Sequence, residues 1–155
     1  MLIVPVIRLA TLADAGEIAQ MSRSYIEQGL GWSWREGRVL RAIRDPATNV
    51  AVMTDLERVI GFGIMQYFEE TAHLALFAVD PGHRNRGLGS RLVSWLEQPA
   101  RIAGIERIRV EARADNSKAI AFYGRLGFVP FKTVSGYYGG IVDAVQLQKR
   151  LAAPA

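Results

Sequence analysis

Hydrophobic and polar residues follow one another along this chain in patterns that predict both strands and helices. Alternating residues and short apolar runs are typical of strands, whereas apolar residues three and four positions apart are typical of one helix face. The first kind of pattern predicts strands over residues 4–10, 49–55, 58–68, 72–79, 106–112, 128–134 and 143–149. Helices between some of these strands make a mixed α/β fold with one central sheet.

Four helices are predicted between the strands, the first three of them from apolar stripes. The first three stripes are Ile18, Met21, Tyr25 and Ile26, then Val39, Leu40 and Ile43, then Leu88, Leu92, Trp95 and Leu96. A fourth helix is expected from about residue 117 to 126, capped by Asp115 or Asn116 and left through Gly127 in a left-handed conformation. Because Pro99 cannot donate a backbone hydrogen bond, it should end or kink the third helix.

The first two helices also carry a start signal, a hydroxyl residue followed three positions later by an acidic one. This capping pattern satisfies backbone N–H groups that have no partner inside the helix. It is found at Thr11 with Asp14 and again at Ser33 with Glu36.

The composition suits one globular domain over residues 1–155. Half of the residues are hydrophobic and 22% are charged, which is an ordinary balance for a folded core. The chain has no cysteine, which excludes disulfides, thiolate metal ligands and cysteine nucleophiles. His73 and His83 are too few for a metal site, so we expect no metal.

Charge and the N-terminal residues bear on location and partners. The N-terminal stretch MLIVPVIRLATLA is apolar but has no basic start and contains Arg8, so we expect no signal peptide, no membrane partner and a cytoplasmic protein. The formal net charge of +4 is scattered, and RNRGLGSR is the one dense basic cluster. Nucleic-acid binding is therefore the least favoured function class. A homodimer is compatible with the sequence.

The stretch LFAVDPGHRNRGLGSRLV is the most informative part of the chain. An apolar strand ends at Val79, a basic glycine-containing loop follows, and a helix begins at Gly87–Gly89. Backbone amides at a helix N-terminus bind anions, and Arg84 and Arg86 would add charge there. The loop lacks the lysine of a Walker motif and the third glycine of a dinucleotide fingerprint. The alternative is a glycine-flanked helix start with solvated arginines.

Two motifs together resemble the signatures of the GNAT superfamily of N-acetyltransferases. Arg84-x-x-Gly87-x-Gly89 follows a strand ending at Asp80–Pro81 and is similar to its acetyl-CoA motif, and VEARADNSKAIAFYGRLGF, Val110 to Phe128, is similar to its second signature. The resemblance implies an α/β fold with a GNAT-like mixed central sheet of about seven strands, flanked by about four helices and splayed open at the acetyl-CoA site. It also implies an acetyl-CoA-dependent transferase acting on a primary amine.

The same resemblance implies a set of cofactor-binding residues. The strand end would bond the pantetheine arm, the loop amides would hold the pyrophosphate, and Asn116 would bond the pantetheine or the acetyl carbonyl. In chain order the set is Phe77, Ala78, Val79, Arg84, Asn85, Arg86, Gly87, Leu88, Gly89, Ser90 and Asn116. Tyr123 would lie beside the sulfur.

Helical geometry gives separate support for two of these residues. Asn116, Ile120 and Tyr123 lie on one helix face, with about 10 Å of axial rise between the first and the last. The alternative is that Tyr123 is a core aromatic and Asn116 merely a helix cap.

A closer resemblance is to the ribosomal-protein alanine N-acetyltransferases (RimI type) and related N-terminal acetyltransferases. It rests on VEARADN, on the twelve residues from Glu111 to Tyr123, and on the tail GYYGGIVDAVQLQKRL. It implies that Glu111 is the base, that Tyr123 is the acid, and that the paired tyrosines Tyr137 and Tyr138 help to bind a peptide. The loop carrying Trp32 and Trp34 could pack over a peptide or a small amine. The N-terminal third, with GLGWSWREG, departs from that subgroup.

Several alternatives remain open from the sequence. Glu111 could instead form an ion pair with Arg109 or Arg113, which lie on the same strand face. The acceptor could be a protein N-terminal amine or a small-molecule amine. A non-catalytic acyl-CoA-binding or regulatory module is the alternative function, although such a module would need only the phosphate loop.

Overall fold

The computed structural model describes residues 4–151, and it builds one sheet of seven strands in the order β1-β2-β3-β4-β5-β7-β6. All neighbouring strands are antiparallel except β4 and β5. The strands are β1 (Val6–Leu9), β2 (Thr48–Asp55), β3 (Arg58–Tyr67), β4 (Thr71–Val79), β5 (Arg107–Arg113), β6 (Val129–Tyr138) and β7 (Val142–Arg150). The first three residues of the apolar N-terminal stretch lie outside the described residues.

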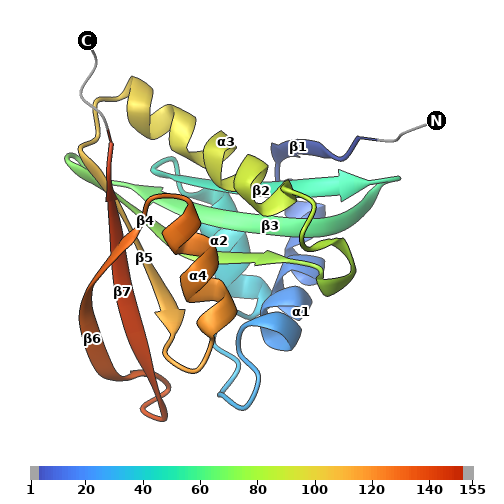
Figure 1. Cartoon of the computed structure of the whole chain (residues 1–155). Helices are drawn as coiled ribbons and strands as arrows, with labels where there is room; N and C mark the ends of the chain where they lie inside the picture. The colour runs from blue at the N-terminus through green and yellow to red at the C-terminus, as the bar shows by residue number, and fades with distance from the viewer. Residues whose placement is uncertain (1–3, 152–155) are drawn as a thin grey trace.

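Four α-helices cover the two faces of the sheet (Figure 1). They are α1 (Ala15–Tyr25), α2 (Glu36–Arg44), α3 (Leu88–Ile102) and α4 (Ser117–Arg125), with short 3-10 turns at Leu12–Asp14 and Pro81–His83. The stripes of α3 and α4 pack into one core and those of α1 and α2 into another on the opposite face. The predicted mixed α/β fold is therefore confirmed. None of the helices within residues 4–151 is long and apolar enough to cross a membrane.

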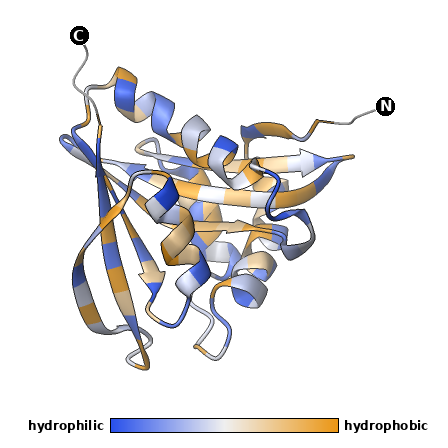
Figure 2. Ribbon diagram, viewed as in Figure 1, coloured by the Kyte–Doolittle hydropathy of each residue, from blue (hydrophilic) through white to orange (hydrophobic). Residues whose placement is uncertain are grey.

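Amphipathic patterning explains this three-layer arrangement. In Figure 2 the hydrophobic residues of the helices and the central strands lie mainly between the layers. The side chains of Phe62 and Ile64 on β3 pack toward α1 and α2, and those of Ile60 and Met65 pack toward α3 and α4. Burial on both faces requires the nearly continuous apolar runs that the central strands carry.

The sheet opens between its two parallel strands. β4 and β5 pair only from Thr71 opposite Arg107 to Leu74 opposite Val110. The register between β3 and β4 shifts at the same level, where Ala75 is an extra residue on β4, and such a bulge bends a strand. The remainder of β4 stays paired with β3 and leaves β5. The splayed sheet expected from the resemblance is thus present.

Three local predictions need correction or extension. Helix α3 does not end at Pro99 but continues to Ile102, because proline removes only one donor and its own carbonyl still accepts from the N–H of Ala103 at 3.0 Å. A kink at Pro99 stays a prediction. Ser33 and Glu36 do not form a capping pair, since the N-cap of α2 is Arg35. Strand β6 is longer than predicted and ends at Tyr138, in a hairpin with β7.

A close approach between β3 and α3 fixes the height of α3 above the sheet. A Cβ atom added to Gly63 would lie 2.6 Å from Cδ1 of Leu96 and 3.5 Å from the ring of Phe77. Glycine in a strand interior often marks such a contact. The middle of α3 therefore rests on the sheet at a position where no side chain fits.

Candidate active site

The start of α3 presents free backbone N–H groups beside the opened end of β4. Gly87 is the N-cap residue with φ of 74°, and the first backbone bond of the helix runs from Arg91 N to Gly87 O at 3.2 Å. The N–H groups of Leu88, Gly89 and Ser90 precede that bond, so the helix itself does not satisfy them. Together with the positive end of the helix dipole they form a site suited to an anion.

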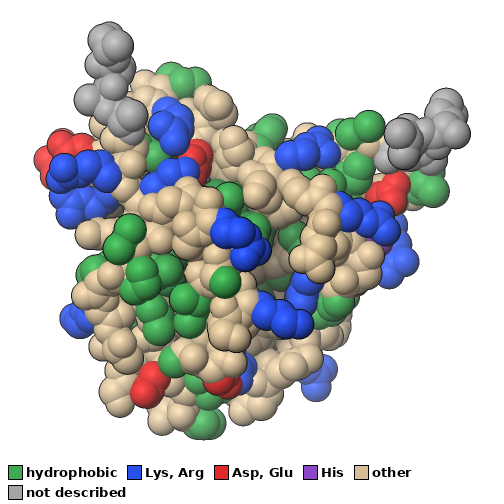
Figure 3. Space-filling view, viewed as in Figure 1, with side chains coloured by type: hydrophobic (Ala, Val, Ile, Leu, Met, Phe, Trp, Pro, Cys, Tyr) green, Lys and Arg blue, Asp and Glu red, His purple; other side chains and the backbone are tan. Residues whose placement is uncertain are grey.

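The predicted basic side chains of this loop lie at the surface. Arg84 and Arg86 are exposed, and Asn85 has φ of 65°, which turns the chain sharply before Gly87. The Arg84 Nε donates to the carbonyl of Val79 at 3.0 Å and ties the loop to the end of β4. Figure 3 shows further Lys and Arg side chains spread over the face that carries α3 and α4. Contact of Arg84 and Arg86 with a phosphate stays a prediction.

The end of β4 has one backbone edge paired and the other facing the opening. Phe77, Ala78 and Val79 pair with residues 61–63 of β3, while the pairing of β4 with β5 has already ended at Leu74. Buried or half-buried backbone groups need partners. This edge can therefore accept a ligand that offers amide hydrogen bonds.

Aromatic rings join the three elements that surround the opening. The ring of Phe77 stacks on Phe122 of α4 at a centroid distance of 5.6 Å and meets Tyr123 edge-on at 6.3 Å. A Cβ atom at Gly89 would lie 3.0 Å from the Phe122 ring, so α3 starts directly against this cluster. The cluster fixes the helix N-terminus relative to the strand end.

Asn116 and Tyr123 both have the structural roles that the sequence left open. The Asn116 Oδ1 accepts from the N–H of Ala119 at 3.0 Å, which makes it the N-cap of α4. Tyr123 is only 6% exposed, and its ring also meets Phe128 edge-on. Burial raises the pKa of the Tyr123 hydroxyl, and Tyr138 and the charge of Glu111 raise it further. Their roles toward acetyl-CoA stay predictions.

Glu111 is the centre of a hydrogen-bonded network at the point where β4 and β5 separate. Its side chain is only 4% exposed. Oε1 contacts His73 Nε2 and accepts from the Tyr137 hydroxyl at 3.1 Å, while Oε2 accepts from Arg109 Nε at 3.0 Å and from Gln146 Nε2 at 3.3 Å. The partners come from β4, β5, β6 and β7. The ion pair with Arg109 that the sequence left open is present, whereas Arg113 pairs with Asp115.

The network keeps Glu111 ionised. Burial raises the pKa of the Glu111 carboxyl, but the hydrogen bond and charge of His73, the charge of Arg109 and the Tyr137 hydroxyl together outweigh burial. The pKa therefore lies below the usual value for a glutamate. At neutral pH Glu111 is therefore ionised and paired with Arg109.

His73 and Gln146 are the members of this network that sequence reasoning missed. Within 72–79, His73 is the one ionisable side chain on an otherwise apolar strand, and it lies between the buried residues Ala72 and Leu74. Such a placement was a usable signal. It becomes informative only with the strand pairing, in which His73 is opposite Arg109 and Gln146 is opposite Glu111.

The predicted acceptor residues separate into two groups. Tyr137 and Tyr138 form an edge-on pair at 4.9 Å, and Tyr137 reaches Glu111. Trp34 is only 8% exposed and belongs to the core of α1 and α2, while the Trp32 Nε1 donates to the Ala19 carbonyl at 3.2 Å. The two indoles thus hold their loop against the helices α1 and α2. Their contact with an acceptor stays a prediction.

Glu27 explains why the loop after α1 is ordered. It is buried and accepts from the Ser22 hydroxyl, from the N–H and hydroxyl of Ser33, and from the N–H of Trp34, at 2.6–3.2 Å. Burial raises the pKa of Glu27, but these hydrogen bonds outweigh burial and lower it. Ser33 is used here and not at the start of α2.

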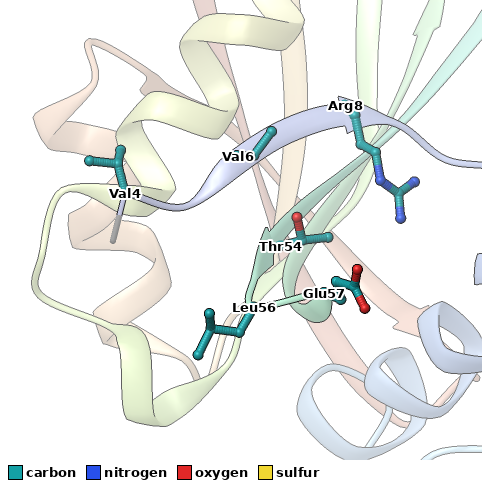
Figure 4. A pocket seen from close by; sticks show the side chains of 6 residues that line it. All are labelled: Val4, Val6, Arg8, Thr54, Leu56 and Glu57. Atoms are coloured by element: carbon teal, nitrogen blue, oxygen red, sulfur yellow. The ribbon is translucent and has the colours of Figure 1, made fainter. Parts of the chain in front are cut away.

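Other clusters and hollows do not add to this site. Within residues 4–151, no three His, Cys, Asp or Glu side chains gather in a way that could hold a metal ion. A shallow hollow at the sheet edge contains none of the predicted site residues (Figure 4). It is lined by Val4, Val6, Arg8, Thr54, Leu56 and Glu57.

A mixed sheet that opens between parallel strands beside a helix N-terminus defines an α/β fold of the GNAT type. The model of the acetyltransferase (GNAT) family matches residues 17–128, and this chain belongs to that family.

Curated relatives are similar to about half of the chain. N-alpha-acetyltransferase MAK3 of Arabidopsis thaliana is 34% identical over 53% of this chain and 43% of its own length. The [ribosomal protein bS18]-alanine N-acetyltransferase of Salmonella typhimurium is 36% identical over 56% of this chain and 58% of its own. The chain thus matches roughly half the length of these relatives.

Solved structures match over nearly the whole chain. Ard1 of Thermoplasma volcanium has a TM-score of 0.84 at 26% identity, covering 96% of this chain and 98% of that one. The ribosomal-protein-S18-alanine N-acetyltransferase of Escherichia coli has a TM-score of 0.78 at 25% identity, covering 98% and 97%. The chain therefore shares the fold of these two proteins.

Proposed function

We propose that this protein, as one domain over residues 1–155, is an acetyl-CoA-dependent N-acetyltransferase that modifies the α-amine of a protein N-terminus by direct transfer. The observation that carries the proposal is the opening between β4 and β5, which has free helix N–H groups at one end and Glu111 at the other. Family membership and relatives named as N-alpha- and ribosomal-protein alanine acetyltransferases support the same reaction.

Acetyl-CoA would lie along the opened strand edge. The N–H groups of residues 88–90 suit its pyrophosphate, because they combine unsatisfied donors with the positive end of a helix dipole. The free backbone edge of residues 77–79 suits the amides of the pantetheine arm. The thioester would then lie between Glu111 and Tyr123.

Glu111, with His73 beside it, is the proposed base. An attacking amine must be neutral, and an α-amine has a pKa near 8, so it needs only modest help at neutral pH. Glu111, ionised and hydrogen-bonded to His73, would accept the proton that the amine releases, directly or through a water. A lysine amine would need about 3 kcal/mol more for deprotonation at neutral pH.

Tyr123 is the proposed acid. As the amine nitrogen bonds to the acetyl carbon, the carbon–sulfur bond breaks and its electron pair goes to the sulfur. Because burial, Tyr138 and Glu111 raise the pKa of Tyr123 above its usual range, the hydroxyl keeps its proton at working pH. It therefore acts first as a hydrogen-bond donor to the leaving thiolate. The thiolate of coenzyme A then gains a proton from this hydroxyl or from water.

An acceptor screen tests the proposal. Thiol release from acetyl-CoA would be measured with alanine-, serine- and methionine-initiated peptides, with the same peptides blocked at the α-amine but containing lysine, and with small amines. We expect acetylation at the free α-amine, located by mass spectrometry. Transfer only to small amines would refute the peptide acceptor, and acetyl-CoA binding without transfer to any amine would favour the non-catalytic module.

A further inference from the structure

One guanidinium joins the acceptor side of the site to the cofactor side. Arg113 is the last residue of β5, and its side chain is only 18% exposed. Its Nη1 donates to the carbonyls of Ile26 at 3.2 Å and Gln28 at 2.7 Å. Its Nε and Nη2 donate to the two carboxylate oxygens of Asp115 at 3.0 and 3.1 Å. Arginine alone among the side chains offers this fork and a third donor direction.

The loop that Arg113 holds behaves as one piece. Ile26 and Gln28 follow the C-terminus of α1, where backbone carbonyls lack helix partners and a cation is favourable. Glu27, between them, binds Ser22, Ser33 and the backbone of Trp34. Residues 26–34 are therefore braced internally by Glu27. Arg113 attaches this braced loop to a part of the chain 85 residues further on.

The other end of the link is the turn that carries Asn116. The Asn116 N–H donates to the Arg113 carbonyl at 2.9 Å, and its side chain caps α4. Figure 1 shows the loop after α1 close to this turn between β5 and α4. A shift of Asn116 would therefore move Arg113, and through it the loop.

We propose that Arg113 is a positioning residue that joins the β5–α4 turn to the loop of residues 26–34, so that coenzyme A bound at the turn further restrains this loop through the Arg113 side chain. The inference rests on the proposed function for its ligand, since coenzyme A must contact the turn at Asn116. It adds that the effect of the cofactor on this loop, and so on acceptor affinity, passes through Arg113. Coupling between two sites is reciprocal, and typical values change affinity by about 5- to 150-fold.

Amide hydrogen exchange with and without coenzyme A tests the coupling. In the wild type we expect coenzyme A to slow exchange in residues 26–34. In Arg113→Met the loop should exchange about tenfold faster without ligand, and coenzyme A should no longer slow it, although its affinity stays within about threefold. Arg113→Lys keeps the charge but loses the fork, so it should restore only part of the protection.

Two variants provide controls. Arg8→Met loses a matching fork to Asp14, at 2.8 and 3.1 Å, and should leave residues 26–34 unchanged. Asp115→Asn weakens the exposed end of the link but keeps both carbonyl contacts, so it should have a small effect.

With an alanine-initiated peptide, Arg113→Met should raise the KM for peptide about tenfold and change kcat little.

The outcomes separate the inference from the proposed function. If residues 26–34 exchange in Arg113→Met as they do in the wild type, the link is wrong, whether or not the enzyme is active. If the loop loosens in the variant but coenzyme A protects it equally in both proteins, the coupling is wrong. Failure of coenzyme A to bind the wild type would refute both the proposed function and the coupling. The Arg113 link would still be tested by comparing amide exchange of residues 26–34 in the unliganded wild type and Arg113→Met.

Discussion

Two halves of the candidate site, one predicted to bind the cofactor and the other the acceptor amine, differ in whether backbone or side chains form them. The cofactor half consists mainly of backbone: the free edge of β4 and the first N–H groups of α3. The acceptor half consists of side chains from β4, β5, β6 and β7 that meet at Glu111. Backbone geometry tolerates many side chains, whereas a network of four partners fails when one is lost. The four predictions below test this contrast.

The largest expected effect is that of Tyr123→Phe on turnover. The ring contacts with Phe77, Phe122 and Phe128 do not need the hydroxyl, so the variant should fold and bind acetyl-CoA as the wild type does. Turnover should fall by about 10²–10⁴-fold, the usual contribution of a positioned acid. Steady-state kinetics and calorimetry measure the two quantities.

Tyr67→Phe is the matched control for Tyr123→Phe. The Tyr67 hydroxyl donates to the Leu96 carbonyl at 2.8 Å, away from the opening. Its loss should lower stability by about 1 kcal/mol and leave turnover unchanged. If Tyr123→Phe kept more than about half of the wild-type turnover, Tyr123 would be only a core aromatic.

Glu111→Gln should have the next largest effect. It keeps the shape of the side chain and removes the charge, so activity at neutral pH should be mostly lost and partly recovered at higher pH, where the amine deprotonates unaided. The melting temperature should also fall, because the ion pair with Arg109 is lost. A pH–rate profile beside a melting curve separates the two roles.

Glu97→Gln controls for the loss of a buried carboxylate. Glu97 is as buried as Glu111 and binds Lys149 and Arg101, but it lies on α3 away from the opening. It should melt earlier with normal turnover. Normal turnover in Glu111→Gln as well would leave Glu111 a purely structural ion-pair partner.

A moderate effect is expected for Gly87→Ala on the cofactor half. Gly87 has φ of 74°, and a Cβ there would meet nothing within 4 Å, so the change adds backbone strain without a clash. Left-handed backbone costs a non-glycine residue about 1–2 kcal/mol. As the loop relaxes, acetyl-CoA affinity measured by calorimetry should fall about tenfold.

Gly104→Ala isolates the strain from the site. Gly104 has nearly the same φ, 75°, and equal space, but it follows the far end of α3. It should lose similar stability and keep its affinity for acetyl-CoA. Equal acetyl-CoA affinities in Gly87→Ala and Gly104→Ala would show that the start of α3 is not the anion-binding site. Gly89→Val is a harsher change, because its side chain would push the Phe122 ring.

The smallest effect concerns acid stability. The pKa of Glu111 is lower in the folded protein than in the unfolded chain, so its stabilising contribution is complete above the unfolded value and is lost as pH falls through the folded value. Between about pH 5 and pH 3 the wild type should therefore lose about 2–4 °C more in melting temperature than Glu111→Gln does. If the melting temperature fell equally with pH in the two proteins, the ionised Glu111 would not stabilise the fold more than the neutral side chain does.

The contrast also explains what the sequence could predict. The cofactor half depends on local signals, such as Gly87 at a helix start, Asn116 as a cap and Gly127 with φ of 97° at a helix end. Short-range chemistry determines each of them. The seven strands and the first three helices followed from periodicity, and α4 followed from its capping residues.

The acceptor half depends on contacts that no local pattern specifies. His73 and Glu111 are 38 residues apart, and Glu111 and Tyr137 are 26 apart. Ser33 matched a helix cap, but the buried carboxylate of Glu27 binds it instead. Pro99 did not end α3, since the helix hydrogen bonds resume with the N–H of Ala103 donating to the Pro99 carbonyl.

The contact between Gly63 and Leu96 supports α3 at one point along its length, about which the helix can tilt. Leu96 lies eight residues, or about 12 Å, from the start of the helix at Leu88. Because a Cβ at Gly63 would push Leu96 outward, Gly63→Ala would tilt α3 and displace the N–H groups at its N-terminus. The absence of a side chain at this one position on β3, directly opposite Phe77, thus affects where the N–H groups predicted to hold the pyrophosphate lie.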